Sequence, residues 1–206
     1  MNRARKKLGP LQSVRIPTDL GEFAAAFTDQ GLAELCFPDR ASVLDEFAGS
    51  PSAKAVQQTT QTLLAILSGN APKRFPVMDL SGGTEFQFAV WQSMLRIPFG
   101  KTKSYGEIAQ DIDNPNAVRA VGAACGANPV PVIVPCHRVL SAGGMGGFSA
   151  GIKWKHRLLG IEGVLTPTLS ETLGVRIEEL LGQPRPRRPA QTHRPESPRM
   201  PRPHAP

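Results

Sequence analysis

Hydrophobic residues in the N-terminal part of the chain change from a strand-like to a helix-like spacing. In residues 20–38, apolar runs flank the turn-forming stretch "DQG" and predict two short strands joined by a turn. In residues 52–68, apolar residues recur with a period of about 3.6 and predict a helix. The stretch "SGNAPKRFP" then breaks this pattern. Residues 1–80 are therefore expected to form a small α+β unit, followed by a linker near residues 70–84.

From Thr84 onward the pattern is helical. Thr84 can cap a helix containing "EFQFAVWQSMLRI", in which Phe88, Trp91 and Leu95 share a face. The next stretch, "SYGEIAQDI", has the spacing of a capping box and predicts a short helix capped by Ser104. We therefore expect two consecutive helices separated by the break "PFG".

A third helix is predicted by "NPNAVRAVGAACGANP", with Asn114 as its cap and with Gly126 and Pro129 ending it. Two short helices joined by a tight turn suggest helix-turn-helix geometry, in which the second helix approaches a nucleic-acid groove. The many small residues around Arg119 also fit a tightly packed core helix, and the pattern alone favours that interpretation. Beyond it, "VPVIV" predicts a buried extended segment, "LSAGGMGGFSAG" a glycine-rich loop and "IKWKHRLLGIEG" a final helix.

The positive charge of the chain lies at its two ends. The 206 residues carry a formal net charge of +7, but the first seven residues and residues 183–206 together carry more positive charge than that, so residues 8–182 are slightly negative. The proline- and arginine-rich end has few large apolar residues to bury, so we expect it to be disordered. It is either a solvated tail or an electrostatic tether to a polyanion such as DNA.

Other features of the composition exclude several classes of protein. No apolar run is long enough to span a membrane, and the basic N-terminus lacks the apolar segment of a signal peptide. The three cysteines are too few for a disulfide framework, which favours a reducing, cytoplasmic location. The local spacings of common zinc sites are missing, so we expect neither a metal nor a cofactor.

Cys136, in the stretch "PVIVPCHRVL", is the strongest candidate for chemistry. It could be a nucleophile, a metal ligand or a buried core residue. The positive charges of His137 and Arg138 are expected to lower the pKa of its thiol. Because adjacent residues of an extended chain point to opposite faces, His137 needs a turn or a bridging water to reach it. Cys36 and Cys125 are expected to be small buried apolar residues.

The stretch "VPCHRV" resembles the active-site motif of the O6-alkylguanine-DNA alkyltransferase family, the methylated-DNA–protein-cysteine methyltransferases. The resemblance runs from about Gly83 to Gly163 and includes "GTEFQFAVWQ", "IPFGKTKSYGEIA", "RAVGAACGANP", "GGFSAG" and "LLGIEG", all in order. The N-terminal stretch "FTDQGLAELCFP" is only weakly similar to that family, and the two tails match nothing in it.

The resemblance implies DNA repair by irreversible, single-turnover transfer of an alkyl group from O6-alkylguanine to the protein, and it leaves open whether O4-alkylthymine is also a substrate. Cys136 would accept the alkyl group. His137 would take the thiol proton through a water molecule, and Glu162 would orient His137. Asn128 would support the turn between the recognition helix and the active site.

Further residues are implied to contact the substrate or DNA. Tyr105 would hydrogen-bond the flipped base, Ser149 would lie near its O6 atom, and Arg119 would fill the gap left in the duplex. The remaining implied contacts are Ala117, Ala120, Arg138, Val139 and Phe148. Two residues depart from the family pattern: Phe148 stands where tyrosine is common and Ala150 where glycine is common. These changes leave open which alkyl groups fit.

The implied fold class is α+β. A small mixed N-terminal α/β domain (11–80) precedes a helical DNA-binding and alkyl-transfer domain (81–182) with a helix-turn-helix, winged-helix-like element. Residues 1–10 and 183–206 would be disordered. The expected partner is double-stranded DNA with an alkylated guanine, bound by a monomer without a membrane.

Two other classes of function compete with alkyl transfer. A lesion-binding protein that transfers nothing would not need Cys136, His137 and Glu162 together. A cysteine hydrolase would turn over repeatedly, and the sequence offers no separate oxyanion motif for it.

Overall fold

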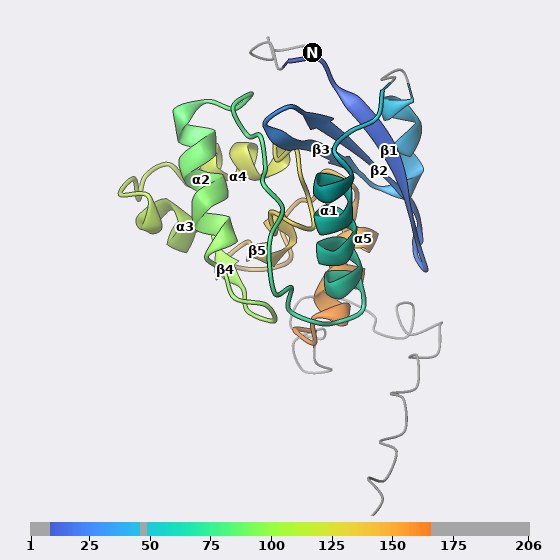
Figure 1. Cartoon of the computed structure of the whole chain (residues 1–206). Coiled ribbons are helices and arrows are strands. Elements are labelled where there is room, and N and C mark those ends of the chain that lie inside the picture. Colours follow the sequence, from blue (N-terminus) through green and yellow to red (C-terminus); the bar gives the residue numbers. More distant parts are fainter. Residues whose placement is uncertain (1–8, 46–48, 166–206) are drawn as a thin grey trace, which may run out of the picture.

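A computed structural model of the chain describes residues 9–45 and 49–165. The predicted disordered tail 183–206 and nearly all of the basic segment 1–10 lie outside the described residues. The remainder has a mixed α/β fold, with a sheet at the upper right of Figure 1 and the helices α2, α3 and α4 at the left.

The N-terminal sheet is antiparallel, with the strand order β1-β2-β3. It consists of β1 (Gln12–Thr18), β2 (Gly21–Thr28) and β3 (Gly31–Cys36). The two strands expected within residues 20–38 are confirmed as β2 and β3. Strand β1 was not predicted, because Pro17 interrupts its alternation. A proline is tolerated there because β1 lies at the edge of the sheet.

A 3-10 helix, η1 (Pro38–Leu44), and the helix α1 (Ala53–Leu67) follow the sheet, and α1 confirms the helix predicted there. The segment after α1 does not behave as a loose linker. Leu32 of β3 donates its N–H to the carbonyl of Val77 at 2.9 Å and accepts a bond from the N–H of Asp79 at 2.8 Å. The predicted linker therefore lies along the free edge of β3.

Helix α2 (Glu85–Leu95) starts where the sequence predicts. The Thr84 hydroxyl accepts the N–H of Gln87 at 3.2 Å, and the Gln87 side chain accepts the N–H of Thr84 at 2.9 Å, which completes a capping box. The predicted shared face is only partly right, because Phe88 is 48% exposed. The buried residues of α2 are Val90, Trp91, Ser93 and Met94, and the helix packs against α4.

The short helix α3 (Tyr105–Asp111) follows the two-residue strand β4 (Lys103–Ser104), and its Ser104 capping box is confirmed. Helix α4 (Val118–Gly126) begins later than predicted. Asn114 does not cap it; the carbonyl of Asn114 instead accepts the N–H of Ala117 in the turn that precedes the helix. Helices α3 and α4 pack against each other and against α2.

The last elements of the described chain are η2, β5 and α5, and they return from the helices α2–α4 toward α1 and the N-terminal sheet. The 3-10 helix η2 (Cys136–Arg138) leads into β5 (Val139–Leu140), which pairs in parallel with β4. The glycine-rich loop follows, and then α5 (Ile152–Ile161), the predicted final helix, which packs beside α1.

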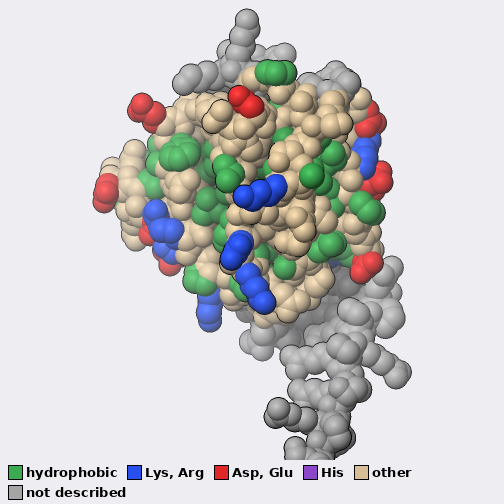
Figure 2. All heavy atoms as spheres, viewed as in Figure 1, with side chains coloured by type: hydrophobic (Ala, Val, Ile, Leu, Met, Phe, Trp, Pro, Cys, Tyr) green, Lys and Arg blue, Asp and Glu red, His purple; other side chains and the backbone are tan. Residues whose placement is uncertain are grey.

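Both halves of the chain contribute to one continuous hydrophobic core. It joins Phe23 and Leu32 of the sheet to Trp91 of α2, Ile108 of α3 and Leu158 of α5. The core therefore does not divide where the two domains were predicted to meet. Figure 2 shows hydrophobic side chains scattered among polar and charged ones on the face that it displays, with Asp and Glu mainly around the edge.

Candidate active site

The segment before Cys136 is buried, as expected, but it is not extended. The N–H of Val134 donates to the carbonyl of Val130 at 2.9 Å, which closes a tight turn. Within this turn Val132 has a φ of 74°, in the left-handed region that β-branched residues rarely adopt. Such strain persists only where surrounding contacts hold it, and it is common at functional sites.

Asn128 supplies those contacts. Its Oδ1 accepts the N–H of Val130 at 3.0 Å, and its Nδ2 donates to the carbonyl of Val134 at 2.8 Å. The same Nδ2 lies 3.1 Å from the Cys136 Sγ and donates to it. One buried amide therefore braces the turn and fixes the direction of the thiol.

Burial raises the pKa of the Cys136 thiol to about 11, although the hydrogen bond from Asn128 and the charge of Lys155 act in the opposite direction. The expectation that the positive charges of His137 and Arg138 lower this pKa is wrong, because burial dominates and His137 acts on the thiol only through its backbone. Cys136 is only 4% exposed, so loss of hydration disfavours the thiolate. The charge of Arg138 is directed at Glu162 instead. At neutral pH the thiol is protonated and needs a base.

Next to Cys136, the side chains of His137, Arg138 and Glu162 form a buried network. His137 Nε2 lies 2.8 Å from Glu162 Oε1, and Arg138 Nε donates to Glu162 Oε2 at 2.9 Å. Arg138 also donates through Nη1 to the carbonyl of Ile97 at 2.8 Å. The side chains of His137 and Glu162 are both 0% exposed. These contacts place the end of α5 directly behind the cysteine-bearing segment.

Burial would raise the pKa of Glu162, but hydrogen bonds from His137 and Arg138 outweigh it and lower this pKa to about 2. Glu162 is therefore ionised. Burial also lowers the pKa of His137, against the opposing effect of Glu162, so the imidazole is neutral at neutral pH. An ionised carboxylate next to Nε2 favours the tautomer with its proton on Nε2. His137 Nδ1 is then an acceptor, and among the described residues it has no hydrogen-bond partner.

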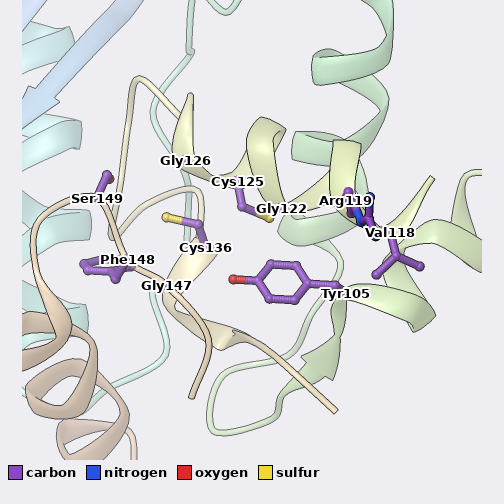
Figure 3. A pocket seen from close by; sticks show the side chains of 10 residues that line it. All are labelled: Tyr105, Val118, Arg119, Gly122, Cys125, Gly126, Cys136, Gly147, Phe148 and Ser149. Carbon is purple, nitrogen blue, oxygen red and sulfur yellow. The ribbon is translucent and has the colours of Figure 1, made fainter. Parts of the chain in front are cut away.

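A pocket of about 450 Å³ opens next to the thiol. Its lining includes Cys136, Tyr105, Arg119, Cys125, Phe148 and Ser149. In Figure 3 Tyr105 and Phe148 lie on opposite sides of Cys136, and the hydroxyl of Tyr105 points toward the middle of the pocket. Helix α4 forms one wall and the glycine-rich loop another.

Tyr105 remains protonated in this pocket, because burial and the neighbouring Cys125 and Cys136 raise the pKa of its hydroxyl. Its position depends on Gly146, which has a φ of 68°. A Cβ at that position would lie 2.9 Å from the Tyr105 hydroxyl oxygen, so a larger residue would push the ring into the pocket. The glycine-rich loop thus provides the space that the tyrosine occupies.

Several known proteins are similar to this chain. Residues 85–164 match the family model "6-O-methylguanine DNA methyltransferase, DNA binding domain". The chain is 53% identical over 91 residues to the inducible methylated-DNA–protein-cysteine methyltransferase of Bacillus subtilis, covering 44% of this chain and 51% of that protein. It is 41% identical over 138 residues to a probable enzyme of the same name from Acanthamoeba polyphaga mimivirus, covering 66% of this chain and 92% of the relative.

The chain belongs to the methylated-DNA–protein-cysteine methyltransferase family. It also resembles the crystal structure of Mycobacterium tuberculosis OGT in complex with DNA, with a TM-score of 0.65 and 36% identity. That similarity covers 79% of this chain and 99% of the solved one. The chain spans about half the length of the Bacillus subtilis relative.

The structure brings most of the residues that the family pattern implies into one place. Tyr105, Arg119, Phe148 and Ser149 line the same pocket as Cys136. Two implied DNA contacts lie on or next to α4: Ala120 is exposed, and Ala117 is half-buried just before the first residue of the helix.

Two of the implied substrate or DNA contacts cannot be made through their side chains. Arg138 is 5% exposed and Val139 is fully buried, so neither side chain is available to a duplex. The guanidinium of Arg138 is paired with Glu162 and lies over the Phe99 ring, 5.4 Å from its centroid. Arg138 therefore holds the histidine–glutamate pair, and Val139 pairs with Lys103 between β5 and β4.

Sequence reasoning missed Lys155, which is fully buried on α5. Its Nζ donates to the carbonyls of Val139 at 2.7 Å, Met145 at 2.5 Å and Gly147 at 3.3 Å. It therefore fastens the glycine-rich loop to the strand that follows the active-site cysteine. A signal existed in the sequence, because Lys155 shares the helical spacing of Leu158, Leu159 and Glu162 and so lies on the buried face.

Cys125 was expected to be a buried apolar residue, and it is 6% exposed. Its Sγ lies 3.5 Å from the Sδ of Met94, and burial raises the pKa of its thiol to about 12. It nevertheless lines the pocket. Within residues 9–45 and 49–165, no helix is long and apolar enough to cross a membrane, and no cluster of three or more His, Cys, Asp or Glu could hold a metal.

Proposed function

We propose that this chain repairs alkylated DNA by transferring an alkyl group from the O6 atom of guanine to the Sγ of Cys136. One observation carries the proposal: the Cys136 thiol borders a base-sized pocket and is held by Asn128. The next residue, His137, forms a buried pair with Glu162. The relatives named above are methyltransferases that act on methylated DNA through a cysteine.

The first step is removal of the thiol proton. A thiol with a pKa near 11 is a weak nucleophile at neutral pH, whereas its thiolate is a strong one. His137 Nδ1 is the acceptor that the Glu162 contact leaves available. We infer that a bridging water carries the proton from Cys136 to His137. The positive charge that forms on the imidazole is balanced by the ionised Glu162.

The transfer step then forms the Sγ–carbon bond while the bond between the alkyl carbon and O6 breaks. The electron pair of the broken bond stays with the guanine, to which the Tyr105 hydroxyl can donate a hydrogen bond. The guanine takes up a proton from water, and the proton held by His137 returns to water. Asn128 Nδ2, which donates to Sγ, stabilises the thiolate before the bond forms. Because the product is a thioether, which water does not cleave, each molecule reacts once.

We assign DNA recognition to α3 and α4, which pack against each other and are joined by residues 112–117, an arrangement similar to a helix-turn-helix element. Arg119 is exposed on α4 and lines the mouth of the pocket, so its side chain can enter the space left by a flipped base. Small residues next to it, such as Ala120, allow the helix to approach a groove closely. We propose that a monomer binds double-stranded DNA in this way.

The two rival functions explain fewer of these contacts. A lesion-binding protein needs the pocket but gives no role to a thiol braced by Asn128 and a buried His137–Glu162 pair. A hydrolase would form a thioester at Cys136 that water then cleaves, and it needs oxyanion donors for which the sequence offers no separate motif.

The proposal is tested by locating the alkyl group after reaction. The protein is mixed with a duplex containing O6-methylguanine, and its peptides are analysed by mass spectrometry. Methylation should occur at Cys136 alone, should disappear in Cys136→Ala, and should persist in the matched variants Cys125→Ala and Cys36→Ala. Methylation at Cys125 or Cys36 in the Cys136→Ala protein would show that the assignment is wrong.

A further inference from the structure

Phe148 forms a wall of the pocket, yet little in its own loop fixes its ring. The preceding Gly147 is exposed and has nothing within 4 Å of the place where a Cβ would lie. The Gly147 carbonyl accepts from Lys155 Nζ at 3.3 Å and the Phe148 carbonyl accepts the Gly151 N–H at 3.0 Å, but these bonds hold the backbone and not the ring. A phenylalanine ring has no polar atom to anchor, so packing alone must set its direction.

That packing comes from the N-terminal part of the chain. The ring of Phe37, directly after β3, meets the Phe148 ring edge-on, with centroids 5.9 Å apart and an interplanar angle of 78°. Edge-to-face contact at this separation is a favoured arrangement of aromatic rings. Phe37 is 3% exposed, so it is itself firmly held.

Two more rings hold Phe37 in place. Trp154 of α5 lies 4.7 Å from it, and Phe23 of β2 lies 5.4 Å from it, between ring centroids. Phe23 and Trp154 also contact each other at 5.8 Å. The Phe148 ring is thus the outermost member of a cluster that joins the sheet and α5 to the pocket.

The same strand also supports the opposite side of the active site. Leu35 of β3 donates its N–H to the carbonyl of Pro129 at 2.9 Å. Pro129 follows Asn128, whose amide directs the Cys136 thiol. Strand β3 is therefore bonded to the turn that directs the nucleophile, and Phe37, at its end, contacts the wall that faces the substrate.

We propose that Phe37 is a positioning residue, which holds the Phe148 ring at a fixed distance from Cys136 and thereby sets the size of the O6 substituent that the pocket accepts. The inference rests on the proposed function. Without the Phe37 ring, Phe148 can swing outward and the pocket widens. A small methyl group then loses its support, whereas a benzyl group gains room.

The test is a double-mutant cycle with Phe37→Leu, Phe148→Leu and the double variant. Second-order rate constants of transfer are measured with duplexes that contain O6-methylguanine or O6-benzylguanine. The strength of one aromatic pair predicts that Phe37→Leu raises the benzyl-to-methyl rate ratio roughly three- to tenfold. In the Phe148→Leu background the same change should leave this ratio unaltered, because the ring that Phe37 positions is gone.

Two variants separate positioning from general loss of stability. Phe27→Leu removes a ring that is 2% exposed in β2 and that makes no ring contact with Phe37 or Phe148 among the described residues, so it should not change the ratio. Phe37→Tyr keeps the ring and should retain the wild-type ratio. If Phe37→Leu does not fold, Phe37→Met, which keeps apolar volume without a ring, takes its place in the cycle.

An unchanged ratio in Phe37→Leu, or an equal change in the Phe148→Leu background, would overturn the inference and leave the proposed function standing. An equal change in Phe27→Leu would have the same meaning, because it would trace the effect to stability. A wild-type protein that transfers no alkyl group to Cys136 from either duplex would contradict the proposed function itself.

Discussion

Replacing Glu162 by glutamine tests the buried network behind the cysteine. The change keeps the size of the side chain but removes its charge. Arg138, whose side chain is 6% exposed, would then keep a buried positive charge without its partner. The carboxamide nitrogen that replaces one oxygen also cannot accept the hydrogen bonds that Arg138 Nε and the Gly100 N–H donate to Oε2.

Two independent estimates of the cost agree. Breaking a buried ion pair by removing one partner destabilises a protein by about 3–5 kcal/mol. The pKa of Glu162 falls from 4.5 to about 2 on folding, and at about 1.4 kcal/mol per unit this corresponds to roughly 3 kcal/mol. Because the folded-state pKa is the lower one, this stabilisation is present above pH 4.5 and is lost as the pH falls toward 2.

The assay is urea unfolding of the wild type and Glu162→Gln at neutral pH and in steps across the acidic range. We expect the variant to lose about 3 kcal/mol at neutral pH and to converge with the wild type as acid protonates Glu162. Glu85→Gln, an exposed change at the start of α2, should stay within about 0.5 kcal/mol of the wild type. Arg138→Met combined with Glu162→Gln should recover at least about 1 kcal/mol of the single variant's loss.

A Glu162→Gln protein as stable as the wild type at neutral pH would refute this reasoning. So would a difference between the two proteins that stays constant down to the lowest pH, because the loss would then have no link to the ionised carboxylate.

Three further predictions concern the reaction. Arg119→Ala should slow repair of a lesion in a duplex by roughly tenfold or more and leave the reaction with free O6-benzylguanine unchanged, because only the duplex base must be unstacked. Equal losses on both substrates would reject the flipping role, and an unchanged melting temperature is the control. Lys155→Met should shift the pH–rate profile to higher pH, because the charge of Lys155 lowers the pKa of Cys136. It should also cost about 1–3 kcal/mol of stability by leaving buried carbonyls unpaired. The exposed Lys153→Met is the matched control, and a profile that does not move would contradict this role. EDTA should leave the transfer rate unchanged, and loss of activity that added zinc restores would overturn that expectation.

The elements set by local contacts could be predicted from the sequence. The capping boxes at Thr84 and Ser104 involve residues three positions apart, so their pattern fixes where α2 and α3 begin. The hairpin of β2 and β3 is equally local, because Thr28 pairs with Gly31 across the turn.

Features that depend on distant partners could not be predicted in the same way. The turn at Val132 adopts a backbone conformation that its own sequence disfavours, and only the contacts from Asn128 show why it is stable. The burial that raises the pKa of the Cys136 thiol likewise depends on the whole fold.

Charge next to Cys136 in the sequence was a misleading guide for the same reason. Arg138 turns toward Glu162, 24 positions away, and loses its influence on the thiol. The cation that does lower the pKa of Cys136 is Lys155, which is distant in sequence but near in space. Alternation of hydrophobic and polar positions carries no information about such pairings.

The central claim is that Cys136 accepts one alkyl group and is consumed by doing so. Intact-protein mass spectrometry tests it most directly, with the mass measured before and after mixing with excess duplex that contains O6-methylguanine. The account predicts that every active molecule becomes heavier by one methyl group in place of one hydrogen, and that the reaction stops after one lesion per protein. Continued loss of the lesion with an unchanged protein mass would contradict it.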